Sequence, residues 1–69
     1  MAGFAESLET IRCVKGLTQE QLAKSAGVTQ AQISYYERGL NVPNVDVALK
    51  LARALGVKVE DLMKGGIKA

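Results

Sequence analysis

The sequence predicts a single all-α domain built from five short helices. Apolar residues recur every three or four positions along most of the chain, which is the spacing of a helix face turned toward a core. No stretch alternates between apolar and polar residues over the length of a strand. The chain has 69 residues, no internal repeat and no linker, so residues 1–69 have room for one small domain.

The first predicted helix covers about residues 3–14. Its inward face consists of Phe4, Leu8 and Ile11, which are spaced i, i+4, i+7 as on one side of an amphipathic helix. We expect this helix to end near Gly16.

Two further helices are marked by capping boxes, in which a threonine and a glutamine three residues later satisfy each other's backbone N–H groups. The first box pairs Thr18 with Gln21, and the second pairs Thr29 with Gln32. Between them, Gly27 fits the left-handed stop of the earlier helix. So short a connection is the pattern of a helix-turn-helix, in which two helices cross at a steep angle.

The fourth predicted helix is capped by Asn44 and ends at Gly56. Its inward side is lined by Ala48, Leu51, Ala52 and Leu55. A short fifth helix is expected at about residues 59–64, and residues 65–69 are expected to form a flexible tail.

The composition favours a globular protein of a reducing compartment. Apolar residues make up 48% of the chain and charged residues 23%, which is typical of a folded domain. The single cysteine, Cys13, excludes an internal disulfide. The N-terminus lacks the features of a signal peptide, and Lys50 and Arg53 interrupt the longest apolar stretch. We therefore expect a cytoplasmic protein with no membrane partner.

The predicted helix over residues 29–38 has an unusual outward face. Ile33 and Tyr36 fall on its inward side. The opposite stripe consists of Ala31, Ser34, Tyr35 and Arg38, with Gln30 beside it. A solvated face normally carries Glu and Lys, whereas this one offers an amide, a hydroxyl, a phenol, a methyl group and one guanidinium.

An ordered set of motifs surrounds this helix. It reads GLTQEQLAKSAGVTQAQISYYERG at residues 16–39 and continues with P…LKLARALGV…EDL. In these motifs, over about residues 5–63, the chain resembles the phage-repressor and Cro-type helix-turn-helix family, also called XRE-like regulators. The resemblance implies a lambda-repressor-like bundle of five helices whose third helix reads the DNA major groove. It also implies a transcriptional regulator, a repressor or autoregulator, that binds a pseudo-palindromic operator in double-stranded DNA as a homodimer.

The resemblance implies roles for the outward stripe and its surroundings. Base-reading positions are Gln30, Ala31, Ser34 and Tyr35. Contacts to the DNA backbone are expected from Gln19, Thr29, Arg38, Asn41 and Asn44. Amides can pair with adenine, hydroxyls can donate or accept, and methyl or aromatic carbons can meet the thymine methyl group. Gln19 matches the family glutamine that bonds a phosphate and buttresses the reading glutamine, Gln30.

Each of these roles has a simpler alternative. Gln19 and Gln30 can be polar surface residues near helix caps, and Tyr35 can be merely exposed. Ser34 can bond a carbonyl one turn back. Arg38 can be a helix-end cation that interacts favourably with the helix dipole.

Two opposite charges, Arg12 and Glu37, lie at the edges of inward-facing stripes. The family resemblance implies that they form a structural ion pair between the first and third helices. The alternative is two unrelated, solvated charges.

Apolar residues of the C-terminal part predict a dimer interface, because so small a domain can bury only part of them. The set is Val42, Val57, Val59, Leu62 and Met63. The alternative is a monomer in which Leu62 and Met63 close the protein's own core.

Two other function classes compete with a DNA-binding regulator. An enzyme is not expected, because the chain has no histidine and no spaced carboxylates or nucleophile–base set, and we expect no cofactor, metal or small-molecule site. The second alternative keeps the fold but binds protein, as an antitoxin or a bridging module does. The net charge of +2 and the uncharged loop at residues 40–44 favour it slightly.

Overall fold

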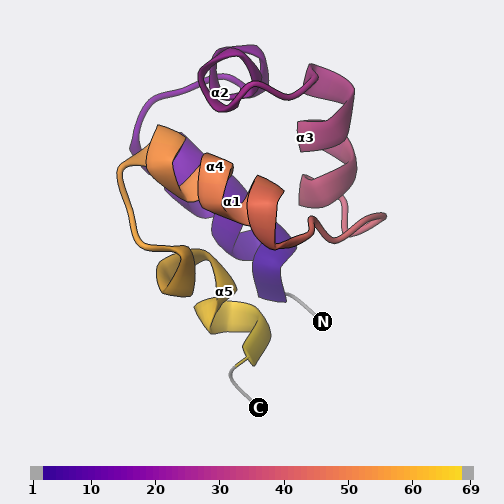
Figure 1. Ribbon diagram of the computed structural model, residues 1–69, viewed down its shortest axis with the longest axis vertical. Helices are drawn as coiled ribbons and strands as arrows, with labels where there is room; N and C mark the ends of the chain where they lie inside the picture. Colours follow the sequence, from indigo (N-terminus) through magenta and orange to yellow (C-terminus); the bar gives the residue numbers. More distant parts are fainter. Residues whose placement is uncertain (1–2, 68–69) are drawn as a thin grey trace.

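The computed structural model describes residues 3–67 as five α-helices and no strand (Figure 1). They are α1 (Gly3–Val14), α2 (Gln19–Ala26), α3 (Gln30–Glu37), α4 (Val45–Leu55) and α5 (Val59–Ile67). The predicted all-α fold with five helices is confirmed. Over this range, no helix combines the length and the hydropathy needed to cross a membrane.

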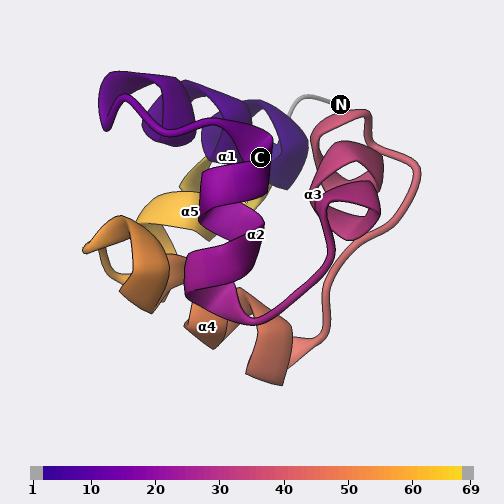
Figure 2. The ribbon, with the colours of Figure 1, turned by 90° about the horizontal axis from the view of Figure 1, so that it is seen from above.

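The helices pack around α1, which α3 and α5 both contact, while α2 packs against α3 and α4 (Figures 1 and 2). In both views α3 stands at one edge of the bundle, and no other helix covers its outer side. The arrangement therefore leaves the outer side of α3 uncovered by the other helices.

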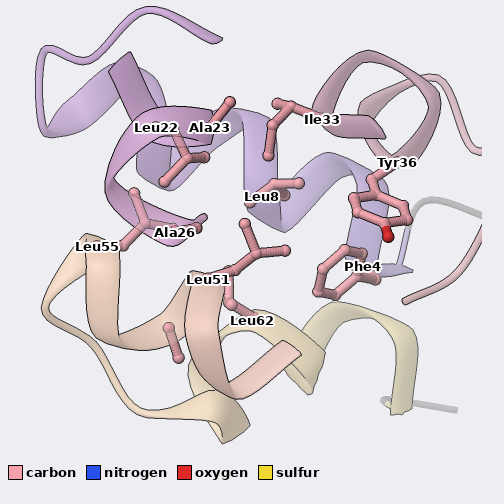
Figure 3. Packing of buried hydrophobic residues seen from close by; sticks show 11 residues of the cluster. Phe4, Leu8, Leu22, Ala23, Ala26, Ile33, Tyr36, Leu51, Leu55 and Leu62 are labelled. Atoms are coloured by element: carbon pink, nitrogen blue, oxygen red, sulfur yellow. The ribbon is translucent and has the colours of Figure 1, made fainter. Parts of the chain in front are cut away.

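Every helix contributes one large side chain that is fully buried. These five residues are Leu8, Leu22, Ile33, Leu51 and Leu62. They converge in the centre of the bundle (Figure 3). Beside them the rings of Phe4 and Tyr36 meet edge to face, with centroids 6.3 Å apart, which is a favoured aromatic geometry. The core thus ties all five helices into one cooperative unit.

The predicted caps of α2, α3 and α4 are confirmed. Thr18 and Thr29 cap α2 and α3, and each completes its capping box with the glutamine three residues on. Asn44 caps α4, where its side-chain oxygen accepts a hydrogen bond from the backbone N–H of Val47 at 2.9 Å. Gly27 follows α2 with φ near +74°, a conformation that a side chain at Cβ disfavours.

The fifth helix differs from its predicted extent. It continues to Ile67, so residues 65–67 belong to α5 and not to the predicted tail. Residues 68–69 lie outside the described residues. Two glycines, Gly65 and Gly66, led to the shorter prediction, but glycine only weakens a helix, by about 1 kcal/mol relative to alanine. Lys58 is a poor N-cap, because its side chain has no acceptor for a backbone N–H. Its own backbone N–H donates to Asp61 Oδ2 at 3.2 Å, so one backbone donor at the start of the helix has a partner.

Candidate nucleic-acid interface

The two sides of α3 have opposite environments. Ile33 and Tyr36 are 0% and 6% exposed and pack into the core. The outward residues Gln30, Ala31, Tyr35 and Arg38 are exposed, and Ser34 is half-buried. The eight-residue helix thus inserts two side chains into the core and turns its outward stripe toward an approaching partner.

The polar groups on this outward face have no hydrogen-bond partner among residues 3–63. Among the side chains of residues 3–63, those of Gln30, Ser34 and Tyr35 make no hydrogen bond to another residue. Ser34 therefore does not bond the carbonyl one turn back, which was the alternative to a binding role. The face offers amide, hydroxyl and phenol groups at once to a partner.

At the C-terminal end of α3, the structure brings Glu37 together with Arg12 of α1. Arg12 Nε donates to Glu37 Oε2 at 2.6 Å and Nη2 donates to Oε1 at 3.1 Å, a bidentate pair. The two side chains are 13% and 4% exposed. The hydrogen bonds that Arg12 donates to Glu37 raise the pKa of the Arg12 guanidinium above its ordinary value. The pair joins α1 to α3.

Gln19, the first residue of α2, joins this pair. Its Nε2 donates to Glu37 Oε1 at 3.0 Å. The resemblance implied that Gln19 supports Gln30, at the N-terminal end of α3, whereas this bond ties it to the C-terminal end. Gln19 and Glu37 are 18 positions apart in the chain, and no periodicity in the sequence signals their contact.

The other residues expected to contact the DNA backbone differ in whether their side chains are already used within the protein. Thr29 and Asn44 use their side-chain oxygens to cap α3 and α4. Asn41 and Arg38 are exposed, and Arg38 is the one cation on the outward stripe of α3. Residues 40–44 carry no charge, so the electrostatic attraction of this region for an anionic partner is modest.

The apolar residues predicted for a dimer interface are divided by the structure. Val42 is 75% exposed, and Val57, Val59 and Met63 are half-buried. Leu62 is 0% exposed, because α5 turns it inward onto the core, and it is not available to a partner (Figure 3).

Two exposed apolar residues of α4 were missed. Val45 is 73% exposed and Leu49, one turn later, is 41% exposed. Their i, i+4 spacing in the sequence was the signal that could have found them. Next to Val45 lies an apolar hollow of about 220 Å³. Its lining consists of Pro43, Asn44, Val45, Ala48, Val59 and Met63.

Known proteins share both the sequence pattern and the fold. A helix-turn-helix family model matches residues 8–62. An uncharacterized HTH-type transcriptional regulator of Methanocaldococcus jannaschii is 42% identical over 55 residues, which cover 80% of this chain and 83% of that protein.

Two solved structures superpose closely. The restriction-modification controller protein C.AhdI from Aeromonas hydrophila has 34% sequence identity and a TM-score of 0.85, over 88% of this chain and 92% of that one. The P22 c2 repressor protein, solved in complex with the synthetic operator 9T, has 31% identity and a TM-score of 0.86. That superposition covers 94% of this chain and 98% of the repressor chain.

Proposed function

The chain belongs to the helix-turn-helix family of phage-repressor and Cro-type (XRE-like) transcriptional regulators, and we propose that it represses or autoregulates transcription by reading a pseudo-palindromic operator as a homodimer. It is a DNA-binding transcriptional regulator with the lambda-repressor-like fold. The observation that carries the proposal is the open face of α3, whose polar side chains have no partner among residues 3–63.

In this proposal α3 lies in the major groove with Gln30, Ala31, Ser34 and Tyr35 toward the base edges. The amide of Gln30 can pair with adenine N6 and N7, and the Ser34 hydroxyl can donate or accept. The Ala31 methyl group and the Tyr35 ring can meet a thymine methyl group. The helix is short, so a few bases per half-site would be read directly.

Contacts to the sugar–phosphate backbone are proposed for Gln19, Thr29, Arg38, Asn41 and Asn44. Because the side-chain oxygen of Asn44 caps α4, Asn44 can offer a phosphate its amide nitrogen. The hydroxyl and the backbone N–H of Thr29 both donate to Gln32 Oε1, at 3.3 and 3.0 Å, so the hydroxyl must turn away from Gln32 to reach a phosphate. The N-terminus of α2, where Gln19 lies, also presents backbone N–H groups that suit a phosphate.

For the homodimer, we propose that an apolar patch made of Val42, Val45, Leu49, Val59 and Met63 pairs with the same patch of a second copy. Exposed apolar residues that adjoin a hollow are typical of an interface. A twofold pairing places each residue against a symmetric counterpart and repeats α3 about 34–36 Å away, one turn of DNA. Val57 comes after the C-terminal end of α4, whereas Val45 lies at the N-terminal end of that helix. The proposed interface therefore does not include Val57.

We also propose a cytoplasmic location. Two of the relatives reported above come from Methanocaldococcus jannaschii, an archaeon, and Aeromonas hydrophila, a bacterium. The DNA of such cells lies in the cytoplasm, and a regulator of their transcription acts there.

The proposed function is tested by the variant Gln30→Ala on a duplex from upstream of the protein's own coding region. We expect the wild-type protein to shift this duplex in preference to an unrelated one of equal length. Gln30→Ala should fold normally and lose about 1–3 kcal/mol of discrimination at one base position, because a paired amide is replaced by a methyl group. Binding to single-base variants of the duplex, followed by mobility shift, measures this.

The control is Thr10→Ala, an exposed residue of α1, which should leave discrimination unchanged. An equal loss on the upstream and unrelated duplexes would assign Gln30 to the DNA backbone. Failure of the wild-type protein to prefer any duplex, even after selection from a random library, would contradict the proposed function.

Operator binding should depend only modestly on salt. Log affinity falls with log salt by about 0.9 for each neutralised phosphate, and Arg38 is the one cation on the outward stripe of α3. Fluorescence anisotropy at several salt concentrations should therefore give a slope shallower than about −8 for the dimer. Arg38→Gln should make the slope shallower by about 2, one for each protomer. A steeper wild-type slope would mean that another basic surface contacts DNA.

A further inference from the structure

We propose that Glu37 is a positioning residue for DNA binding, which acts through Gln19 without touching DNA. The inference rests on the proposed function, because it takes the phosphate contact of Gln19 as its premise. Glu37 lies outside the proposed interface, and it orients the Gln19 amide so that an N–H donor faces the phosphate.

Three helices meet at the Glu37 carboxylate. Glu37 is the last residue of α3, Gln19 is the first residue of α2, and Arg12 lies in the last turn of α1. Oε1 of Glu37 accepts hydrogen bonds from both Gln19 Nε2, at 3.0 Å, and Arg12 Nη2, at 3.1 Å. The Glu37 side chain is 4% exposed, so it is not itself available to DNA.

The chemistry of the carboxylate sets the orientation of the Gln19 amide. An ionised carboxylate accepts hydrogen bonds and donates none, so it can face only the nitrogen end of the amide. One N–H of Gln19 Nε2 is used by Glu37. The second N–H of the same nitrogen stays available to a phosphate oxygen. Because the side chain is half-buried and already held, less rotamer freedom is lost when DNA binds.

Arg12 completes the arrangement in two ways. Its bidentate contact neutralises the Glu37 carboxylate, which would otherwise repel a nearby phosphate. Its remaining nitrogen, Nη1, donates to the backbone oxygen of Leu17 at 2.7 Å, directly before the N-cap Thr18. One guanidinium therefore holds both the carboxylate that orients Gln19 and the chain segment that leads into α2.

A double-mutant cycle in DNA affinity tests the inference. The variants are Gln19→Ala, Glu37→Gln and their combination, measured by anisotropy on the preferred duplex at a temperature where circular dichroism shows full folding. Gln19→Ala should weaken binding about tenfold, the scale of one charge-assisted hydrogen bond, on preferred and unrelated DNA alike. Glu37→Gln should weaken it about fivefold when Gln19 is present and less than twofold in the Gln19→Ala background.

Leu55→Val, a core truncation outside this network, is the control for stability and should leave affinity unchanged while the protein is folded. If Glu37→Gln does not fold, Arg12→Met/Glu37→Met carries the same cycle without a stranded charge.

The outcomes are distinguishable. A loss from Glu37→Gln that is equal with and without Gln19, or no loss at all, would overturn the positioning role and leave the proposed function intact. If Gln19→Ala binds as tightly as the wild type, its phosphate contact and the inference both fall. If the wild-type protein prefers no duplex, the proposed function itself fails.

Discussion

Replacing Arg12 by methionine is expected to lower the free energy of unfolding by about 3–5 kcal/mol, a large share of the stability of so small a domain. The reason is the environment of its partner. The Glu37 side chain is 4% exposed, and without Arg12 its carboxylate would be buried with Gln19 Nε2 as its remaining side-chain donor. The backbone oxygen of Leu17 would also lose its hydrogen bond from the guanidinium.

Urea denaturation followed by circular dichroism measures this loss. The control is Arg12→Met/Glu37→Met, which removes both charges and should be more stable than the single variant, because no charge is stranded. A single variant as stable as the wild type would mean that the pair is solvated. A double variant less stable than Arg12→Met would show that the unpaired Glu37 carboxylate carries no such penalty.

Replacing Met63 by glutamate is expected to separate the proposed dimer into monomers. Met63 is half-buried and lines the apolar hollow beside α4, so a second copy pairing there would enclose the new charge. An unpaired charge in such a place costs on the order of 3 kcal/mol or more, which is at least a hundredfold in the dimer dissociation constant. Operator binding should fall in parallel, since only the dimer engages two half-sites.

Sedimentation velocity with circular dichroism separates this effect from unfolding. Because Met63 also packs against the core, Val45→Glu is the second variant, as Val45 is 73% exposed and its replacement should not disturb folding. The matched control is Val14→Glu, which puts the same charge on an equally exposed valine at the end of α1. A wild-type protein that stays monomeric at tens of micromolar, both alone and on DNA, would rule out the dimer.

The sequence was sufficient for those features that depend on neighbouring residues. The starts of α2 and α3 follow from threonine and glutamine three positions apart, and their capping boxes form as expected. The inward and outward faces of α3 follow from helical periodicity, because Ile33 and Tyr36 are buried where the spacing places them. Such patterns are local, so a reader of the sequence can find them without knowing how the helices pack.

Features that depend on packing were not accessible in the same way. Leu62 and Met63 are adjacent apolar residues, and only the rotation of α5 on α1 decides that Leu62 is buried and Met63 is left at the hollow. The contact between Gln19 and Glu37 requires α2 to start beside the end of α3. Neither short-range periodicity nor capping chemistry tells which helix ends lie side by side.

The open face of α3 has a consequence for how such a protein can change over generations. Substituting Gln30, Ala31 or Tyr35 removes no side chain from the core, since Ile33 and Tyr36 alone anchor the helix there. Different residues of the same eight-residue helix therefore determine the DNA preference and the stability of the fold. A lineage can drift to a new DNA target one exposed residue at a time, while selection for a stable fold acts on the other side of the helix.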